Sequence, residues 1–138
     1  MIETRIIEIK TSGKDDIANI TQDVQNMISG SKLKEGCAIL FVQSTTSSLT
    51  IIEYEEGLLS DIPRALERIA PKSPDYAHER AWHDGNGHSH VRAAIIGPNL
   101  TVPFKEGKLM LGTWQQIVLC EFDVRPRRRT IIVQLLTG

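Results

Sequence analysis

The chain has 138 residues, of which 41% are hydrophobic, and its formal net charge is -1 at pH 7. This length suits one compact domain with its own core, and the near-zero charge gives no reason to expect binding to nucleic acid or to an anionic membrane. The longest apolar runs are far shorter than the roughly 20 residues that span a bilayer, and no signal core is present, so we expect a cytoplasmic protein with one domain over residues 1–138.

The first part of the chain has the patterns of a strand, a helix and two more strands. Residues 5–9 alternate weakly in hydropathy and predict a strand. Apolar side chains recur at helical spacing between residues 15 and 29, with acidic residues at the start and Gly30 beyond the end, which predicts a helix. The apolar run at 35–43 predicts a buried strand, and residues 47–54 predict another.

A second helix and a long polar segment follow. Apolar spacing predicts a helix within residues 55–70. Because proline lacks the amide hydrogen that a helix interior needs, we expect this helix to begin near Ser60 or Asp61, with Pro63 in its first turn. Residues 71–87 are polar and rich in turn-forming residues, and we expect a long loop there. Loops of this length usually carry function or are disordered.

The remaining third of the chain contains a short helix and several strands. Residues 89–96 predict two helical turns, which Gly97 ends. Strand patterns then follow at four places, 99–104, 109–113, 114–123 and 130–136. Because the turns between them are short, the strands are expected to pair antiparallel. Runs of strands with segregated helices predict the α+β class.

All four histidines of the chain, His78, His83, His88 and His90, lie within thirteen consecutive residues, beside Asp84. Imidazole is the commonest protein ligand of zinc and similar metals. If the segment is extended, His88 and His90 point to the same side, and the neighbouring glycines let the backbone turn and bring Asp84 close. The pattern predicts either a metal centre with an open coordination position or a solvated loop whose histidines pair with carboxylates.

Five consecutive hydroxyl residues, 44–48, precede an apolar strand that leads to Glu53. Hydroxyls and turn amides can hold phosphate oxygens, although serine and threonine also suit a simple polar turn. A carboxylate on a buried strand is costly unless it is paired or binds a metal, so we expect Glu53 to face a histidine or a metal ion.

Two further segments each admit two interpretations. In the segment 112–115, Gly112 permits a tight turn, and Trp114 offers a flat surface that either stacks on a ligand or packs in the core. The arginine-rich segment 125–129 either holds phosphate or forms a solvated turn or a subunit contact. It has no interleaved aromatic residues, so we do not expect a nucleic-acid site.

These motifs together resemble the YjbQ-like family, also called the secondary thiamine-phosphate synthases. Residues 87–129, GHSHVRAAIIGPNLTVPFKEGKLMLGTWQQIVLCEFDVRPRRR, are similar to the signature half of that family, and TTSSLTIIE resembles its HTTAALTINE strand and turn. The resemblance covers essentially the whole chain. It implies an α+β fold with an antiparallel β-sandwich and two or three packed helices, assembled as a homotrimer.

The resemblance also implies a transferase reaction. Hydroxymethylpyrimidine diphosphate would be joined to thiazole phosphate, with release of diphosphate, in a polar pocket of histidine, glutamate and threonine side chains. The leaving diphosphate needs cations, so a divalent metal such as Mg²⁺ or Zn²⁺ is the expected cofactor. The alternative is a metal- or phosphate-binding trimer with another activity, for example hydrolysis. In both cases the partner is a small phosphorylated molecule.

The residue types and the resemblance together give each position a role. The candidates for catalysis are Glu53, His83 and His90. The candidates for substrate binding are Thr45, Thr46, Arg92, Thr113, Trp114 and Gln115. The candidates for metal binding are His78, His83, Asp84, His88 and His90. Ser44 stands where the family usually has a histidine, and serine is a poorer metal ligand than imidazole.

Overall fold

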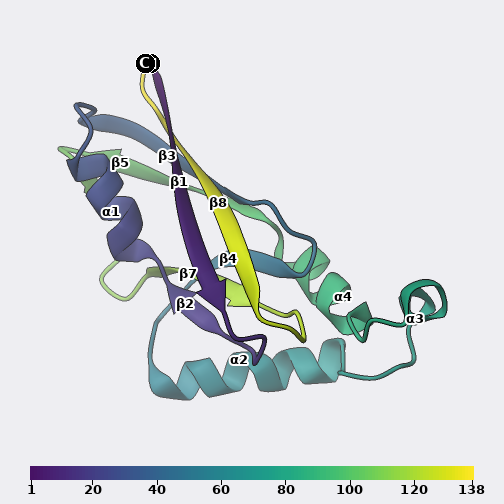
Figure 1. Ribbon diagram of the computed structural model, residues 1–138. Coiled ribbons are helices and arrows are strands. Elements are labelled where there is room, and N and C mark those ends of the chain that lie inside the picture. The colour runs from purple at the N-terminus through teal and green to yellow at the C-terminus, as the bar shows by residue number, and fades with distance from the viewer.

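The computed structural model describes all 138 residues as two antiparallel sheets and four helices (Figure 1). The larger sheet has the order β1-β8-β3-β5-β6 and consists of β1 (Ile2–Thr11), β3 (Glu35–Val42), β5 (Asn99–Lys105), β6 (Lys108–Leu109) and β8 (Arg127–Leu136). The smaller sheet has the order β2-β7-β4 and consists of β2 (Ile17–Asn19), β4 (Ser47–Ile52) and β7 (Gln116–Glu121). The helices are α1 (Thr21–Ser29), α2 (Glu56–Ile69), α3 (Ala77–Trp82) and α4 (Gly87–Ile96). The predicted α+β class is confirmed, with four helices rather than two or three.

The two sheets share one apolar core. In β8 every second side chain is buried, including Ile131, Val133 and Leu135, because successive residues of a strand point to opposite faces. These side chains belong to the same cluster as Leu119 of the smaller sheet and Val24 of α1. The larger sheet therefore packs one face toward the smaller sheet, with α1 closing the core between them.

The opposite face of the smaller sheet is covered by helices. Leu66 of α2 and Ala93 of α4 pack against Val118, Cys120 and Phe122 in and beside β7. The molecule thus has three layers, with the larger sheet outermost, the smaller sheet in the middle, and α2 and α4 on the far side. This arrangement lays α4 against β4.

β8 is an interior strand of the larger sheet, between β1 and β3. It pairs with β1 from Ile2 opposite Leu136 to Thr11 opposite Arg127. The two ends of the chain consequently lie side by side, at the top of Figure 1, where the Met1 amino group donates to the carbonyl of Thr137.

The helix predicted from residue 15 begins six residues later, at Thr21. Asp16 closes a turn, because its carboxylate accepts hydrogen bonds from the backbone N–H groups of Ser12 and Lys14. The next residues join the sheet as β2, with Ile17 opposite Cys120. The helical spacing of the isoleucines was therefore misleading over the first six residues.

The predicted start of the second helix was also wrong. α2 begins at Glu56, and Pro63 lies in its interior. The Glu55 carboxylate accepts hydrogen bonds from the N–H groups of Gly57 and Leu58, so the helix is capped about two turns before the proline. Proline then removes one hydrogen bond from the helix without ending it.

Other boundaries also differ from the predicted ones; for example, α4 begins at Gly87 rather than at residue 89. Helix α3 interrupts the loop predicted at 71–87, and β6 is only two residues long. β8 begins at Arg127, so most of the arginine-rich segment is strand rather than turn. None of the four helices has the length and apolar character that crossing a membrane requires.

Candidate metal centre and adjoining groove

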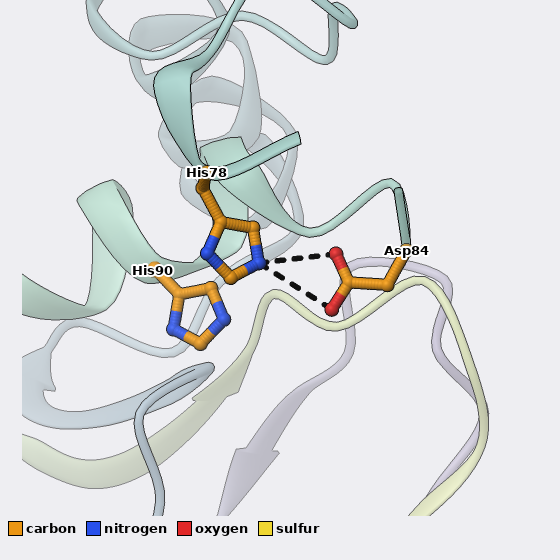
Figure 2. Close-up of side chains that lie close together, drawn as sticks. All are labelled: His78, Asp84 and His90. Atoms are coloured by element: carbon orange, nitrogen blue, oxygen red, sulfur yellow. Dashed lines mark hydrogen bonds and ion pairs between the residues drawn. The ribbon is translucent and has the colours of Figure 1, made fainter. Parts of the chain in front are cut away.

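Three of the predicted metal ligands lie together, on α3, on the turn after it and on α4. Figure 2 shows the rings of His78 and His90 and the carboxylate of Asp84 gathered at one point. Nε2 of His78 lies 3.1 Å from Oδ1 of Asp84, and the centroids of the two rings are 4.4 Å apart. One ligand atom from each residue lies within 4.8 Å of the others. All three side chains are partly exposed, so an ion can reach them.

The turn that carries Asp84 is held by side-chain acceptors. The Glu79 carboxylate accepts hydrogen bonds from the N–H groups of Gly85 and Gly87, each at 2.9 Å. Gly85 has φ 75°, which suits glycine, and a Cβ at Gly87 would lie 2.6 Å from the Tyr76 side chain. The two glycines of the motif are therefore needed for the turn and for its close approach to Tyr76.

The environment of Asp84 favours its charged form. The backbone N–H of Asn86 donates to Oδ1 of Asp84 at 3.0 Å, and this bond holds the pKa of the carboxyl below its usual value. Burial opposes the shift, and His78 adds to it. The carboxyl is therefore an anion over the neutral pH range, as a metal ligand must be.

His90 also borders a groove over the start of β4. The groove has a volume of about 350 Å³, and its lining consists of Ser44, Thr45, Ser47, His90, Ala93, Ala94 and Pro98. Thr45 is exposed, whereas the hydroxyl of Ser47 is buried without a hydrogen-bond partner. A small molecule in this groove would lie beside a hydroxyl side chain and beside one of the three clustered ligands.

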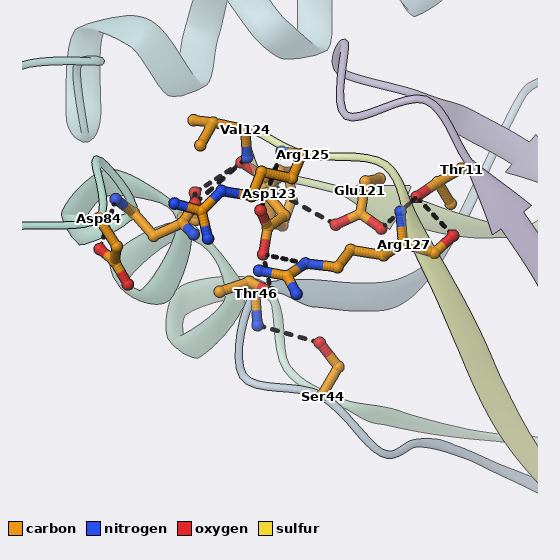
Figure 3. A network of polar contacts seen from close by, with 12 residues as sticks. Thr11, Ser44, Thr46, Asp84, Glu121, Asp123, Val124, Arg125 and Arg127 are labelled. Atoms are coloured by element: carbon orange, nitrogen blue, oxygen red, sulfur yellow. Dashed lines mark hydrogen bonds and ion pairs between the residues drawn. The ribbon is translucent and has the colours of Figure 1, made fainter. Parts of the chain in front are cut away.

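Charged side chains are buried behind the groove, where β7 ends and β8 begins (Figure 3). Arg129 binds both carboxylate oxygens of Glu121, and its Nη2 also donates to the hydroxyl of Thr46 at 2.7 Å. That hydroxyl donates in turn to Asp123, which also accepts from Arg127. We call Thr46, Glu121, Asp123, Arg127 and Arg129 the polar network. It gives every buried charge a partner of opposite sign.

The other two histidines lie outside the cluster. His83 ends α3 with φ 50° and is exposed. His88 is buried, its Nδ1 has no partner, and burial lowers its pKa, with a further contribution from Arg92. The expectation that His88 and His90 share one side was wrong, because the segment is helical and residues two apart in a helix point in nearly opposite directions.

Two predicted substrate-binding residues already have protein partners. Thr46 is buried in the polar network, between Asp123 and Arg129. Arg92 is 1% exposed, and its guanidinium donates to Glu67 at 2.7 Å and to the carbonyl of Ala70 at 2.9 Å. Of the hydroxyl run, Thr45 is the candidate that the structure leaves beside the centre.

The remaining predicted residues lie at the other end of β4. Glu53 and Trp114 border a second groove, together with Asn19, Tyr54, Glu55, Thr113 and Gln116. Glu53 is exposed rather than buried, and Trp114 is 71% exposed rather than packed in the core. Gln115 accepts a hydrogen bond from the N–H of Gly112 and closes the turn before β7. The six residues of β4 separate the two grooves by roughly 20 Å.

The structure also reveals residues that the sequence interpretation did not single out. Glu121 and Asp123 each take a partner from the arginine-rich segment, and Arg128 pairs with Glu8. The available signal was charge complementarity: two acidic residues two apart at the end of an apolar strand, followed closely by arginines with the same spacing. These arginines pair within the chain.

Comparisons with known proteins place the chain among similar proteins over nearly its full length. The family model described as UPF0047 protein YjbQ-like matches residues 5–138. A UPF0047 protein of Archaeoglobus fulgidus is 37% identical, covering 94% of this chain and 98% of the relative. The UPF0047 protein YugU of Bacillus subtilis is 31% identical, covering 96% of this chain and 98% of the relative.

Two solved structures show the same fold. A YbjQ-like protein of unknown function from Sulfolobus solfataricus P2 superposes with a TM-score of 0.89 at 30% sequence identity, over 100% of both chains. A hypothetical protein from Aeropyrum pernix K1 superposes with a TM-score of 0.91 at 29% identity, over 99% of both chains.

Proposed function

The chain belongs to the YjbQ-like UPF0047 family, and from this starting point we propose that it binds a divalent metal ion at His78, Asp84 and His90. We propose further that it acts on a small phosphorylated molecule in the groove that His90 borders. The supporting observation is that two imidazoles and one carboxylate, with ligand atoms within 4.8 Å of one another, adjoin a groove with a hydroxyl side chain.

The donor set fits a divalent ion. Metal bonds from imidazole and carboxylate are about 2.0–2.2 Å long, so the ligand atoms around one ion are at most about 4.4 Å apart. The 4.8 Å spread of the three residues closes to that range by small side-chain rotations. Two histidines with one carboxylate leave coordination positions open, as in catalytic rather than structural sites. Two imidazoles among the three ligands favour zinc or a similar transition metal over magnesium, which prefers oxygen ligands.

The reaction we propose is the joining of hydroxymethylpyrimidine diphosphate to thiazole phosphate, with release of diphosphate. A bound divalent ion would neutralise charge on the leaving diphosphate. The exposed hydroxyl of Thr45 would donate a hydrogen bond to a phosphate oxygen. The hydroxyl of Ser44 accepts a hydrogen bond from the N–H of Thr46 at 3.0 Å, so this residue shapes the turn where the family usually has a histidine.

Hydrolysis is the competing activity for the same groove. A metal centre with open positions also activates water. In hydrolysis, water rather than the thiazole would be the nucleophile, and a phosphate ester would be cleaved. The two reactions differ in what they require: coupling needs both precursors, whereas hydrolysis proceeds with either one.

Metal binding is tested by calorimetry with Zn²⁺ and Mn²⁺ on the wild type, His90→Ala and His83→Asn. We expect His90→Ala to weaken binding by at least about tenfold, because one of three ligands is lost. His83→Asn is the matched control, since it removes a histidine outside the cluster and asparagine tolerates the positive φ of that position. Equal affinities in all three proteins would contradict the centre.

The activity is tested with both phosphorylated precursors together and each alone, with Mg²⁺ or Zn²⁺. Thiamine phosphate formed only from the pair supports coupling. Phosphate or diphosphate released from a single precursor supports hydrolysis instead. If the wild type binds metal but forms no product in any arm, the metal centre stands and both proposed reactions are refuted.

We also propose a homotrimer, as the family resemblance implies. The outward face of the larger sheet supports an assembly, because Ile6 of β1 pairs with Ile132 of β8, which pairs with Phe41 of β3. Ile6 is 59% exposed and Phe41 is 44% exposed, so an apolar row has no cover within the chain.

Light scattering tests the assembly. We expect the wild type to have three times the chain mass and Ile6→Lys to dissociate, because a charge would be buried in the interface. Ser60→Lys, at an exposed polar position on α2 on the opposite side of the molecule, is the control that leaves the assembly intact. A wild type that runs as a monomer at micromolar concentration would refute the trimer.

A further inference from the structure

We infer that Asn86 and Asp123 are positioning residues that fix the spacing between Asp84 and His90, the ligands on the two sides of the metal centre. The inference rests on the proposed metal site and goes beyond it, because it concerns the residues that fix the ligands rather than the ligands themselves. It starts from one observation: Asn86 lies between Asp84 and His90 in the chain and hydrogen-bonds to both through its backbone.

The backbone of Asn86 contacts both ligand-bearing residues. Its N–H donates to Oδ1 of Asp84 at 3.0 Å, and its carbonyl accepts from the N–H of His90 at 3.1 Å. A rotation of this one peptide unit would therefore move the carboxylate and the first turn of α4 relative to each other. The separation of the ligand atoms depends on where Asn86 is held.

The side chain of Asn86 is what holds it. The side chain is buried, and its Oδ1 accepts from the hydroxyl of Ser89 at 2.8 Å and from the N–H of Val124 at 3.2 Å. The side chain also lies beside Asp123 and helps to lower the pKa of that carboxyl. Asn86 is thus attached to the segment that joins β7 to β8, which is thirty-odd residues away in the chain.

A purely local role does not explain these contacts. Asn86 occupies the N-cap position of α4, where asparagine is favoured because its side chain can accept from the first free N–H groups of the helix. No such capping bond is present. The side chain instead turns toward Val124 and Asp123, so a connection to the polar network replaces the capping hydrogen bond.

Asp123 is a fixed point for that connection. The residue is 2% exposed, and its Oδ2 accepts from Thr46 at 3.0 Å and from Arg127 at 2.9 Å. Its Oδ1 accepts from the N–H of Arg125 at 3.0 Å. Burial acts to raise the pKa of Asp123, but these hydrogen bonds together bring it below its usual value. The carboxylate is buried, charged and hydrogen-bonded at both oxygens.

Outer residues of this kind matter for metal binding because ligands must be held at the spacing that the ion requires. Loss of one such contact typically lowers metal affinity or activity about 10–100-fold. Asn86 and Asp123 would act in this way without touching the ion.

The test uses two substitutions at one position and one control. Asn86→Ala removes all side-chain contacts, whereas Asn86→Asp keeps the acceptor for Ser89 and Val124 but places a second carboxylate beside Asp123. The control is Ser31→Ala. Ser31 is a buried polar residue with hydrogen bonds to Ile28 and Leu33, at the link between α1 and β3, far from α3 and α4 (Figure 1).

Three quantities are measured on each protein: Zn²⁺ affinity by calorimetry, the free energy of unfolding, and the nuclear Overhauser effect between the ring protons of His78 and His90 without metal. We expect both Asn86 variants to bind Zn²⁺ about 10–100-fold more weakly and to lose the ring-to-ring effect. Ser31→Ala should lower stability and leave affinity and the ring-to-ring effect unchanged.

Wild-type Zn²⁺ affinity together with a persistent ring-to-ring effect in Asn86→Ala would overturn the inference, even if that protein were less stable. If the wild type binds no Zn²⁺, the proposed metal function fails, and the ring-to-ring effect alone then decides whether Asn86 positions the two sides. If Asn86→Ala does not fold, Ser89→Ala takes its place, because it removes one of the two donors to Oδ1 of Asn86. We then expect the same losses of Zn²⁺ affinity and of the ring-to-ring effect, but smaller.

Discussion

The two halves of β7 and β8 contrast sharply in chemistry. Along most of their length the strands bury aliphatic side chains, such as Leu119 and Val133, between the sheets. Where the strands approach the histidines, the same inward positions carry Glu121 and Arg129. These two consecutive strands, one in each sheet, thus serve both as core and as support for the candidate site.

The contrast separates stability from geometry. Apolar burial contributes about 25 cal/mol per Å² and has no directional requirement, so the aliphatic half stabilises the fold and tolerates small adjustments. A buried ion pair recovers little net free energy after desolvation, but its hydrogen bonds have fixed directions. The charged half therefore adds little to the free energy of folding. Its main contribution is to fix the positions of the adjoining loops.

The largest expected effect comes from breaking the buried ion pair. Arg129→Ala should lower the free energy of unfolding by about 3–5 kcal/mol, because it leaves Glu121 buried without its partner. The neighbouring Arg128→Ala should cost less than about 1 kcal/mol, because its pair with Glu8 is exposed. Chemical denaturation of both variants checks this. Equal losses would remove the distinction between buried and exposed pairs.

The aliphatic half should respond in stability alone. Leu40→Ala empties a fully buried position of β3 and should cost about 2–5 kcal/mol. Metal affinity should stay at the wild-type value, because the cavity lies in the shared core and not in the polar network. Denaturation and calorimetry on the same preparation test the contrast, which would fail if Leu40→Ala weakened metal binding as much as Asn86→Ala.

A smaller effect is expected at the glycine that opens α4. Gly87→Ala places a Cβ 2.6 Å from the Tyr76 side chain and should cost about 1–3 kcal/mol through overpacking. Gly30→Ala is the control, since this residue has an ordinary helical backbone and the change should stay within about 1 kcal/mol. Thermal unfolding compares the two variants. Equal melting temperatures would show that the close approach of Gly87 to Tyr76 does not require glycine.

The smallest effect concerns acid. Burial acts to raise the pKa of Asp16, but its hydrogen bonds with Ser12 and Lys14 bring it below the usual 3.8. A lowered folded-state pKa gives stability that is present above the unfolded pKa and is lost as the pH falls through and below it. Asp16→Asn should therefore flatten the stability profile below about pH 4. An unchanged acid slope in urea titrations at several pH values would contradict this role.

The sequence predicted the interior of the sheets better than the boundaries of the helices. Apolar residues located β3, β4, β5 and β8, because a strand with one buried face must carry an apolar residue at every second position. The helix starts failed where a carboxylate acts on nearby backbone N–H groups, as Asp16 and Glu55 do. Such contacts depend on rotamers and turns that apolar spacing does not encode.

The candidate site divides in the same way. His78, Asp84 and His90 were predicted together because they are neighbours in the chain and a turn suffices to join them. Glu53 was placed with them wrongly, since the length of β4 carries it to the opposite end of the sheet. The polar network joins residues from three segments, the start of β4, the end of β7 and the start of β8, so only the folded structure shows how Asn86 is anchored.

The central place of β8 in the larger sheet also governs when this protein can fold. β1 is synthesised long before β8, its only sheet neighbour, which lies more than a hundred residues later in the chain, and β3 pairs with the same late strand on one side. Pairings this distant in sequence form slowly, because the entropy of closing a long loop is lost before any stabilising contact forms. The nascent chain must therefore keep two apolar strand edges from aggregating until β8 has been synthesised, and ribosome-bound chains that stop before Arg127 should be readily cut by proteases.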